Sequence, residues 1–194
     1  MKIALDLDEV IADTLCTIIQ FHNDTYGTRL TREQFTSYRF WEIWGGTREE
    51  AVDKVHAFHR TSYAHSVRPV AGAQDAVCAL GKENDLYIVT SRANEFVGKT
   101  EQWLATHFPG AFAEVHFANH YSKNDRTEKS KADICEKLGV QMLVEDSVDF
   151  AIECAREGRD VFLLDRPWNQ TDRLPSGVYR VSSWEEIMEI AKVL

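Results

Sequence analysis

The feature that most constrains the fold is a regular alternation, from Gly72 onward, of short apolar runs with helix-like segments. The apolar runs are LYIVTS at 86–91, a short one near 114–118, QMLVED at 141–146 and DVFLLD at 160–165. The helix-like segments span 73–83, 95–107, 131–138 and 147–157, and a final strand and helix follow. Nearly continuous apolar runs of this length are typical of strands buried on both faces. The alternation therefore predicts an α/β fold: a Rossmann-like parallel sheet sandwiched between helices, with KIALDLDEV as its first strand.

Size and charge narrow the class of protein. The chain has 194 residues, of which 44% are hydrophobic, and a formal net charge of −9. Nothing approaches the ~18 consecutive apolar residues of a membrane span, and the start shows no basic and apolar leader, so we expect a cytoplasmic protein without a membrane partner. The negative charge argues against binding of polymeric nucleic acid but leaves room for one small phosphate ester.

Cysteines and histidines are arranged unfavourably for a zinc site. The four cysteines are widely spaced, lack a CxxC pair and are predicted to be reduced core thiols: Cys16, Cys78, Cys135 and Cys154. His116 and His120 are four residues apart, but a strand running into a loop gives that spacing no ligand geometry. His56 and His59 are expected on a solvated helix face.

A different kind of sequence interrupts the alternation between the first strand and Gly72. Helix-like spacing over 11–26 is followed by the aromatic segment TREQFTSYRFWEIWGG at 31–46. Thr47 and Glu50 form a capping signal for a helix continuing to 65. We therefore predict a core of residues 1–13 and 69–194, with residues 14–68 inserted as a small helical cap over the sheet.

Polar side chains gather where the predicted strands end. Ligands of such sheets bind beyond the carboxyl ends of the strands. The residues expected there are Asp6 and Asp8, then Thr90, Ser91 and Arg92, then Glu145, Asp146 and Asp149, with Lys131 opening the preceding helix. Converging carboxylates require a cation, and oxygen ligands without thiolates favour Mg²⁺ over zinc. The hydroxyls and the ammonium suit a phosphate beside the metal, so the pattern predicts phosphoryl transfer.

The spacing of Asp6 and Asp8 fits a two-step displacement. Asp6 can attack phosphorus and form an aspartyl-phosphate. Asp8 can protonate the leaving alkoxide and then deprotonate the hydrolytic water. Lys129 is an alternative to Lys131 as the phosphate-binding ammonium, and either Glu145 or Asp149 could support the metal.

These residues, taken in order, resemble the four motifs of the haloacid dehalogenase-like (HAD) hydrolase superfamily. The motifs are DLDEV at 6–10, TSR at 90–92, Lys131 and VEDS at 144–147, and the resemblance spans residues 2 to about 165. Within the superfamily, YGTRLTREQFTSYRFWEIWG and LLDRPWNQ resemble the 5′(3′)-deoxyribonucleotidases and related small nucleotidases.

The resemblance implies a role for each motif residue. Asp6 would be nucleophile and metal ligand, and Asp8 acid/base and ligand through its backbone carbonyl. Asp146 would be the remaining metal ligand of the protein. Thr90 and Lys131 would bind phosphate. Ser91 and Arg92 are further candidates for phosphate binding, and a surface ion pair is the alternative role for Arg92.

The aromatic residues of the cap have two interpretations. Large rings can form the core of a small helical cap, or one or two of them can stack on a nucleobase. The cluster consists of Phe35, Tyr38, Phe40, Trp41 and Trp44. Trp41 and Trp44 are the best candidates for substrate contacts. The loop RPWNQ at 166–170 can either shape the rim of the site or serve packing alone.

The sequence therefore predicts a Mg²⁺-dependent phosphomonoesterase acting on (deoxy)nucleoside monophosphates, with a small phosphorylated metabolite as its partner. A homodimer is compatible with this prediction. A dehalogenase needs no proton donor two residues after its nucleophile, so Asp8 argues against that chemistry. A phosphatase for a sugar phosphate or another small metabolite, and a non-catalytic phosphate-ligand-binding protein, remain as alternatives.

Overall fold

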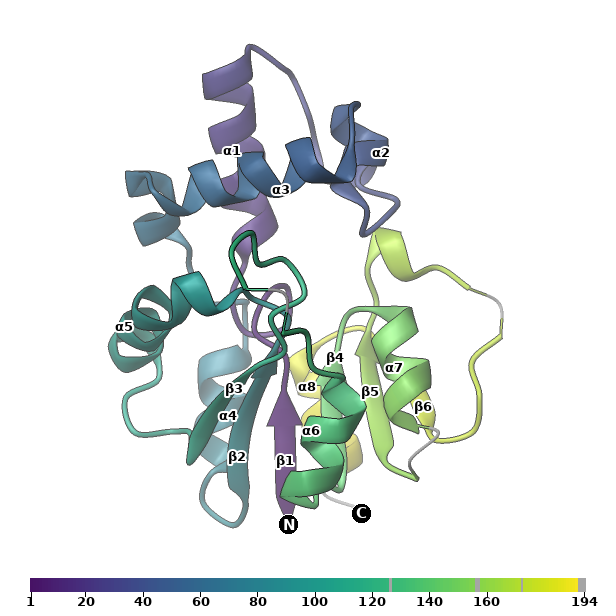
Figure 1. Ribbon diagram of the computed structural model, residues 1–194. Helices are drawn as coiled ribbons and strands as arrows, with labels where there is room; N and C mark the ends of the chain where they lie inside the picture. Colours follow the sequence, from purple (N-terminus) through teal and green to yellow (C-terminus); the bar gives the residue numbers. More distant parts are fainter. Residues whose placement is uncertain (126, 156–157, 172, 192–194) are drawn as a thin grey trace.

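A six-stranded parallel sheet forms the centre of the computed structural model (Figure 1), which describes residues 1–125, 127–155, 158–171 and 173–191. The strands are β1 (Lys2–Leu5), β2 (Asp85–Thr90), β3 (Glu114–Phe117), β4 (Met142–Glu145), β5 (Asp160–Leu164) and β6 (Val178–Val181). Their order is β3-β2-β1-β4-β5-β6, and all neighbouring pairs are parallel. The chain reverses its direction of travel across the sheet between β1 and β4, which is where such folds bind ligands. The predicted fold class is confirmed.

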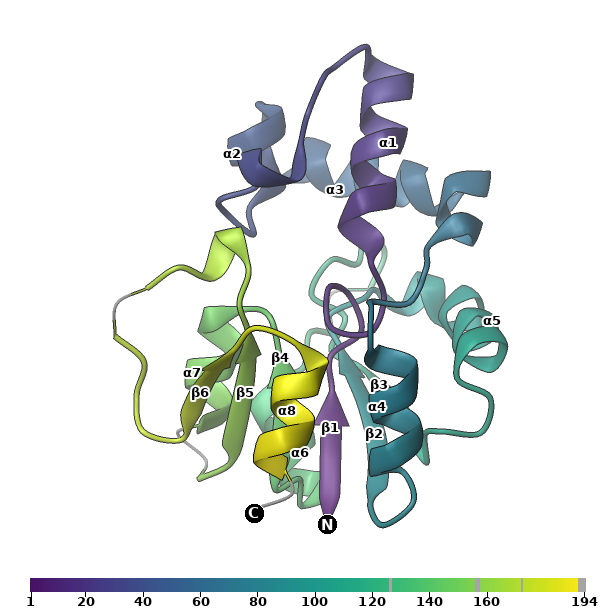
Figure 2. The ribbon, with the colours of Figure 1, turned by 180° about the vertical axis from the view of Figure 1, so that it is seen from behind.

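Each face of the sheet packs against its own layer of helices. In β1, Ile3 and Leu5 join one buried cluster and Ala4 joins the other, because successive side chains of a strand point to opposite faces. One face carries α6 (Lys131–Leu138) and α7 (Val148–Ala155), in front in Figure 1. The other face carries α4 (Ala73–Leu80), α5 (Val97–His107) and α8 (Trp184–Ala191); α4 and α8 are in front in Figure 2.

Residues 14–68, the segment predicted to be a cap and called the cap below, lie beyond the carboxyl ends of the strands, at the top of Figure 1. Its elements are α1 (Thr14–Tyr26), α2 (Phe40–Trp44), α3 (Arg48–His59) and the 3₁₀ turns η1 (Arg32–Gln34) and η2 (Ser62–Ser66). Phe21 makes edge-to-face contacts with Phe58 and Tyr63, with ring centroids 5.8 Å apart in both pairs. These contacts hold the first helix of the cap against α3 and η2.

Helix α1 begins three residues later than the sequence pattern predicts. After β1 the chain makes a tight turn in which the amides of Ile11 and Ala12 both donate to the carbonyl of Leu7, at 3.0 and 2.8 Å. Glu9 has a φ of 62° in this turn, and its carboxylate accepts a hydrogen bond of 2.6 Å from the amide of Leu15. The helix therefore starts only after this turn is complete, and Glu9 satisfies one of its first amides.

Helix α3 is also shorter than predicted, and its histidines are not solvated. The capping box of Thr47 and Glu50 is confirmed, but the helix ends at His59 and η2 follows as a separate turn. The prediction that His56 and His59 face solvent is wrong, since they are 3% and 6% exposed. The His59 ring stacks on Phe96 with centroids 4.1 Å apart, because this side of α3 rests on the core.

The cysteine prediction holds for one pair of residues only. Cys135 and Cys154 are buried between α6, α7 and the sheet, and all four cysteines are free thiols. Cys16 and Cys78 are exposed, so their placement in the core was wrong. Both lie on helices that are amphipathic, and the apolar character of their neighbours does not reveal which side of the helix faces the sheet.

Among the residues that the structure describes, no helix combines the length and the apolar character that crossing a bilayer requires.

Candidate active site

A buried lysine joins two carboxylates at the carboxyl end of the sheet. Asp6 directly follows β1, Glu145 ends β4, and Lys131 is the first residue of α6. The Nζ atom of Lys131 lies 3.0 Å from Oδ1 of Asp6 and 2.6 Å from Oε1 of Glu145, and its side chain is fully buried. Lys129 is exposed, so the structure brings Lys131, and not Lys129, to the predicted nucleophile.

Glu145 uses both of its carboxylate oxygens within the protein. Oε1 accepts from Lys131, and Oε2 accepts from the backbone amides of Asp146 and Ser147, at 2.7 and 3.1 Å. The residue thus holds the lysine and shapes the turn after β4. Asp149, the other candidate for this place, is an exposed residue in the first turn of α7.

Two aromatic side chains that the motifs did not predict hold Asp146. The Tyr38 hydroxyl donates to Oδ1 at 3.0 Å, and the indole Nε1–H of Trp168 donates to Oδ2 at 2.9 Å. Asn169 donates to the backbone carbonyl of Asp146 at 2.8 Å. The segments RPWNQ and TSYRF therefore both reach the site. For RPWNQ the sequence offers the rim of the site as one of two roles, and for TSYRF it indicates only an aromatic cluster in the cap.

The electrostatics of this acid cluster favour a divalent cation. Asp6, Glu145 and Asp146 each offer an oxygen, all within 4.8 Å of one another. Three carboxylates against the one ammonium of Lys131 leave a formal charge of −2 in a buried place, which is costly without a further cation. Oδ1 of Asp6 is buried and, apart from the Lys131 ammonium at 3.0 Å, has no partner among the described residues.

The pKa values of Asp6 and Asp146 reflect the same excess of negative charge. Burial raises the pKa of Asp6 to about 7; Lys131 opposes this effect, and the neighbouring Glu145 reinforces it. Burial and the charges of Glu145 and Asp6 raise the pKa of Asp146 well above its ordinary value. Glu145 accepts from three donors, whereas Asp146 accepts from two neutral side chains. Asp6 is paired with Lys131. Asp6 and Asp146 therefore keep more lone pairs for an ion than Glu145 does. Oxygen donors of this kind suit Mg²⁺.

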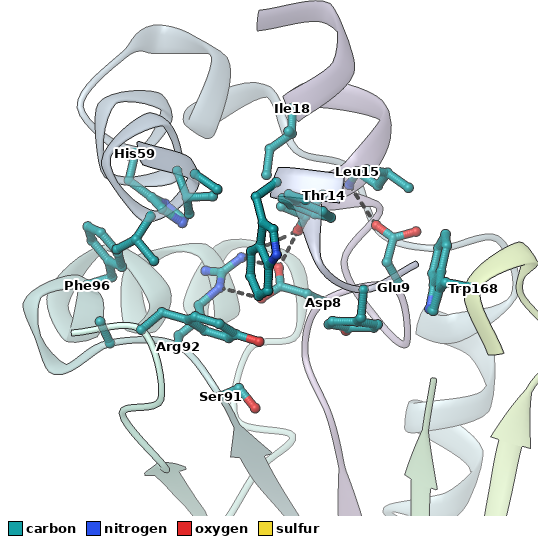
Figure 3. Close-up of a pocket in the computed structure, with 18 of the residues that line it drawn as sticks. Asp8, Glu9, Thr14, Leu15, Ile18, His59, Ser91, Arg92, Phe96 and Trp168 are labelled. Atoms are coloured by element: carbon teal, nitrogen blue, oxygen red, sulfur yellow. Dashed lines mark hydrogen bonds and ion pairs between the residues drawn. The ribbon is translucent and has the colours of Figure 1, made fainter. Parts of the chain in front are cut away.

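Asp8 is not part of this group of three acids and is paired with Arg92 (Figure 3). Nε and Nη2 of Arg92 lie 2.9 and 2.7 Å from the two carboxylate oxygens of Asp8, and the Thr14 hydroxyl also donates to it. Burial raises the pKa of Asp8, but the charge of Arg92 and these hydrogen bonds outweigh burial and lower it. Arg92 also donates to Thr100 at 3.1 Å, so its guanidinium is anchored inside the molecule.

A cavity of about 130 Å³ lies between the cap and the core, beside Asp8. Most of its lining is apolar and comes from α1, α2 and α3 above and from the loops after β2 and β3 below. The lining side chains include Ile18, Phe40, Trp41, Val55, Phe96 and Tyr121. Ser91 and Arg92 also line it, whereas Thr90 is buried behind them, where its hydroxyl accepts from the amide of Arg92.

The two tryptophans predicted to contact substrate have different places. Trp41 lines the cavity. Trp44 does not; its ring stacks on His22 with centroids 4.8 Å apart and packs against Phe40 at 4.7 Å. Of the two, the structure therefore brings only Trp41 to the cavity, and Trp44 belongs to the interior of the cap.

The doubly wound sheet and the acid cluster at its carboxyl end define a phosphomonoester hydrolase of the HAD superfamily. The family model described as "5′ nucleotidase, deoxy (Pyrimidine), cytosolic type C protein" matches residues 1–194. The chain belongs to this family.

Individual relatives are distant in sequence but similar in fold. A nucleotidase of Clostridium acetobutylicum is 20% identical over 190 residues, which cover 98% of this chain and 93% of the relative. The crystal structure of a phosphatase from the same organism has a TM-score of 0.73 at 15% identity, covering 100% and 98% of the two chains. A magnesium-bound HAD-hydrolase of Bacillus subtilis has a TM-score of 0.64 at 17% identity, covering 97% of each chain.

Proposed function

We propose that the protein is a Mg²⁺-dependent phosphomonoesterase that hydrolyses (deoxy)nucleoside monophosphates through an aspartyl-phosphate on Asp6. The observation that carries this proposal is the buried cluster in which Lys131 lies 3.0 Å from Asp6 and the acids remain undercompensated. With a divalent cation bound, such a cluster would keep the Asp6 carboxylate ionised near a phosphate dianion.

Each core residue has a defined task in this proposal. Asp6 attacks phosphorus, and Lys131 keeps its carboxylate in place and attracts the phosphate. Thr90 and Ser91 donate to phosphate oxygens from the end of β2. Asp6, Asp146 and the backbone carbonyl of Asp8 would hold the Mg²⁺, which supplies positive charge against the phosphate.

The proposed acid/base must exchange partners during the reaction. In the arrangement with Arg92, Asp8 is ionised and fits the second half of the reaction, in which a base removes a proton from water. The first half requires a protonated Asp8 at the leaving oxygen. Asp8 would therefore have to leave Arg92 when the substrate arrives.

The leaving group would occupy the cavity under the cap, with residues 14–68 acting as a separate unit that closes over it. Its apolar and aromatic lining supports a nucleoside, because a base can stack on Trp41. A hexose, which carries hydroxyls all round its ring, would find few hydrogen-bond partners on the apolar part of this lining. The family to which the chain belongs supports the same choice.

A substrate panel tests the proposal. We expect deoxyribonucleoside and ribonucleoside monophosphates to be hydrolysed faster than hexose phosphates, with activity lost in EDTA and restored by Mg²⁺. Asp149→Asn is the matched control for substitutions in the acid cluster. Asp149 is close in sequence to Asp146 but exposed, so its substitution should not alter turnover. Faster turnover of hexose phosphates would favour a sugar phosphatase, and no turnover even of p-nitrophenyl phosphate would favour a binding protein.

A further inference from the structure

Tyr38 is a cap residue whose hydroxyl contacts the acid cluster of the core. It precedes α2 and crosses to the core, where its hydroxyl lies 3.0 Å from Oδ1 of Asp146. The second donor to the same carboxylate, Trp168, belongs to the core turn η4 (Pro167–Asn169) and lies 2.9 Å from Oδ2. Asp146 is thus held from two sides, by one group of the cap and one group of the core.

We propose that Tyr38 is a positioning residue that couples the position of the cap to the binding of the metal ion by Asp146. The inference rests on the metal site of the proposed function. Hydrogen bonds to a ligating carboxylate fix its orientation and commonly alter metal affinity strongly. Because one of these bonds comes from the cap, orienting the ligand and docking the cap become a single event.

The surroundings of Tyr38 favour a fixed donor. Its ring meets Trp168 edge to face, with centroids 6.0 Å apart, and it lines both the cavity beside Asp8 and a second cavity reaching Ser147 and Asp149. A phenol is protonated at neutral pH, so the Tyr38 hydroxyl is a donor there.

Another cap residue docks beside it. Arg32 of η1 pairs with Glu9 in the turn after β1, and its guanidinium lies 5.6 Å from the ring centroid of Trp168. This ion pair holds the loop after η1 over the site without contacting Asp146. The Tyr38 hydroxyl can therefore form or lose its hydrogen bond to Asp146 while Arg32 still attaches the loop to the core.

Linkage makes the coupling measurable from both ends. If the docked Tyr38 favours ion binding, ion binding must favour the docked Tyr38 by the same factor. Removal of the hydroxyl should weaken ion binding by roughly tenfold, the lower end of the range for such outer contacts. Without the hydroxyl, Mg²⁺ should also no longer change the hydrogen exchange of the cap residues around Tyr38.

The test combines calorimetric Mg²⁺ binding with hydrogen exchange of residues 36–44, with and without Mg²⁺, on the full chain. For the wild type we expect binding and slower exchange in Mg²⁺. Tyr38→Phe should bind about tenfold more weakly and lose the Mg²⁺-dependent protection. Trp168→Phe, which removes the core donor, should bind more weakly but keep that protection. Tyr63→Phe is the matched control, because its hydroxyl donates to exposed Asp24 elsewhere in the cap.

Two results would overturn the inference, and they are distinguishable. Wild-type affinity and retained Mg²⁺-dependent protection in Tyr38→Phe, with an unchanged thermal melt, would refute the coupling and leave the proposed function intact. Absence of Mg²⁺ binding to the wild type, or binding unaffected by Asp146→Asn, would remove the metal site and the proposed function together with the coupling.

Discussion

The floor and the roof of the site are built on opposite principles. The floor, made by Asp6, Lys131, Glu145 and Asp146, is buried, charged and linked by direct ion pairs and backbone hydrogen bonds. The roof, made by the cap, presents mainly apolar and aromatic side chains to the neighbouring cavity beside Asp8. Under the proposed function, the reaction chemistry would reside at the ends of the strands, and most contacts to the leaving group would come from the cap.

This difference between a charged floor and an apolar roof predicts which property of the protein a substitution in each of them should change. A change in the floor alters charge balance in a low-dielectric place, so it should affect turnover or stability strongly. A change in the roof alters apolar contacts and should act on substrate affinity or on packing of the cap. The following four predictions test this division.

The largest effect is expected from Asp6→Asn. The amide cannot attack phosphorus, so kcat should fall by at least about a thousandfold. The fold should persist, because the substitution preserves shape and removes a charge from an undercompensated cluster. Steady-state kinetics and circular dichroism check this prediction. Turnover of Asp6→Asn at the wild-type rate would disprove Asp6 as the nucleophile.

Lys131→Met should be the most destabilising change in the floor. It leaves the buried carboxylates without their ammonium, and loss of one partner of such a pair costs about 3 to 5 kcal/mol. Urea unfolding without divalent cations measures the loss. Lys129→Met, two residues away and exposed, is the control and should stay within about 0.5 kcal/mol of the wild type.

Trp41→Ala and Trp44→Ala should separate the two roles of the roof. Loss of a stacking partner in the cavity should raise KM for a nucleotide about tenfold in Trp41→Ala, with little change in kcat. Trp44→Ala should instead lower stability by roughly 2 kcal/mol through lost packing inside the cap. Equal effects of both changes on KM would contradict the division.

The last effect, which appears only below pH 6.5, is a pH dependence at the contact between cap and core. Burial, reinforced by the charge of Arg92, lowers the pKa of His59 to about 3, whereas an unfolded histidine titrates near its ordinary 6.5. Below pH 6.5 His59 binds a proton in the unfolded chain but not in the folded chain. The free energy of unfolding therefore falls by about 1.4 kcal/mol for each unit by which the pH is lowered. His59→Phe should lack this contribution between pH 6.5 and 4.5, as measured by unfolding at each pH.

The sequence predicted the floor better than the roof. Strand periodicity located the ends of β1 and β4, and ends of parallel strands meet at one edge, so the convergence of Asp6, Glu145 and Asp146 followed from topology. The burial of His56 and His59 could not be predicted in the same way, because it depends on how α3 rests on loops remote in sequence.

By itself the sequence determined the alternating parallel fold, the place of the acids at the ends of its strands and the family of the chain. Local periodicity and the short reach of strand connections suffice for these properties. Only the tertiary structure decided that Asp8 pairs with Arg92, that Trp41 rather than Trp44 reaches the cavity, and that Tyr38 and Trp168 hold Asp146. Such contacts join segments far apart in the chain, and their geometry depends on how cap and core dock, which no local pattern encodes.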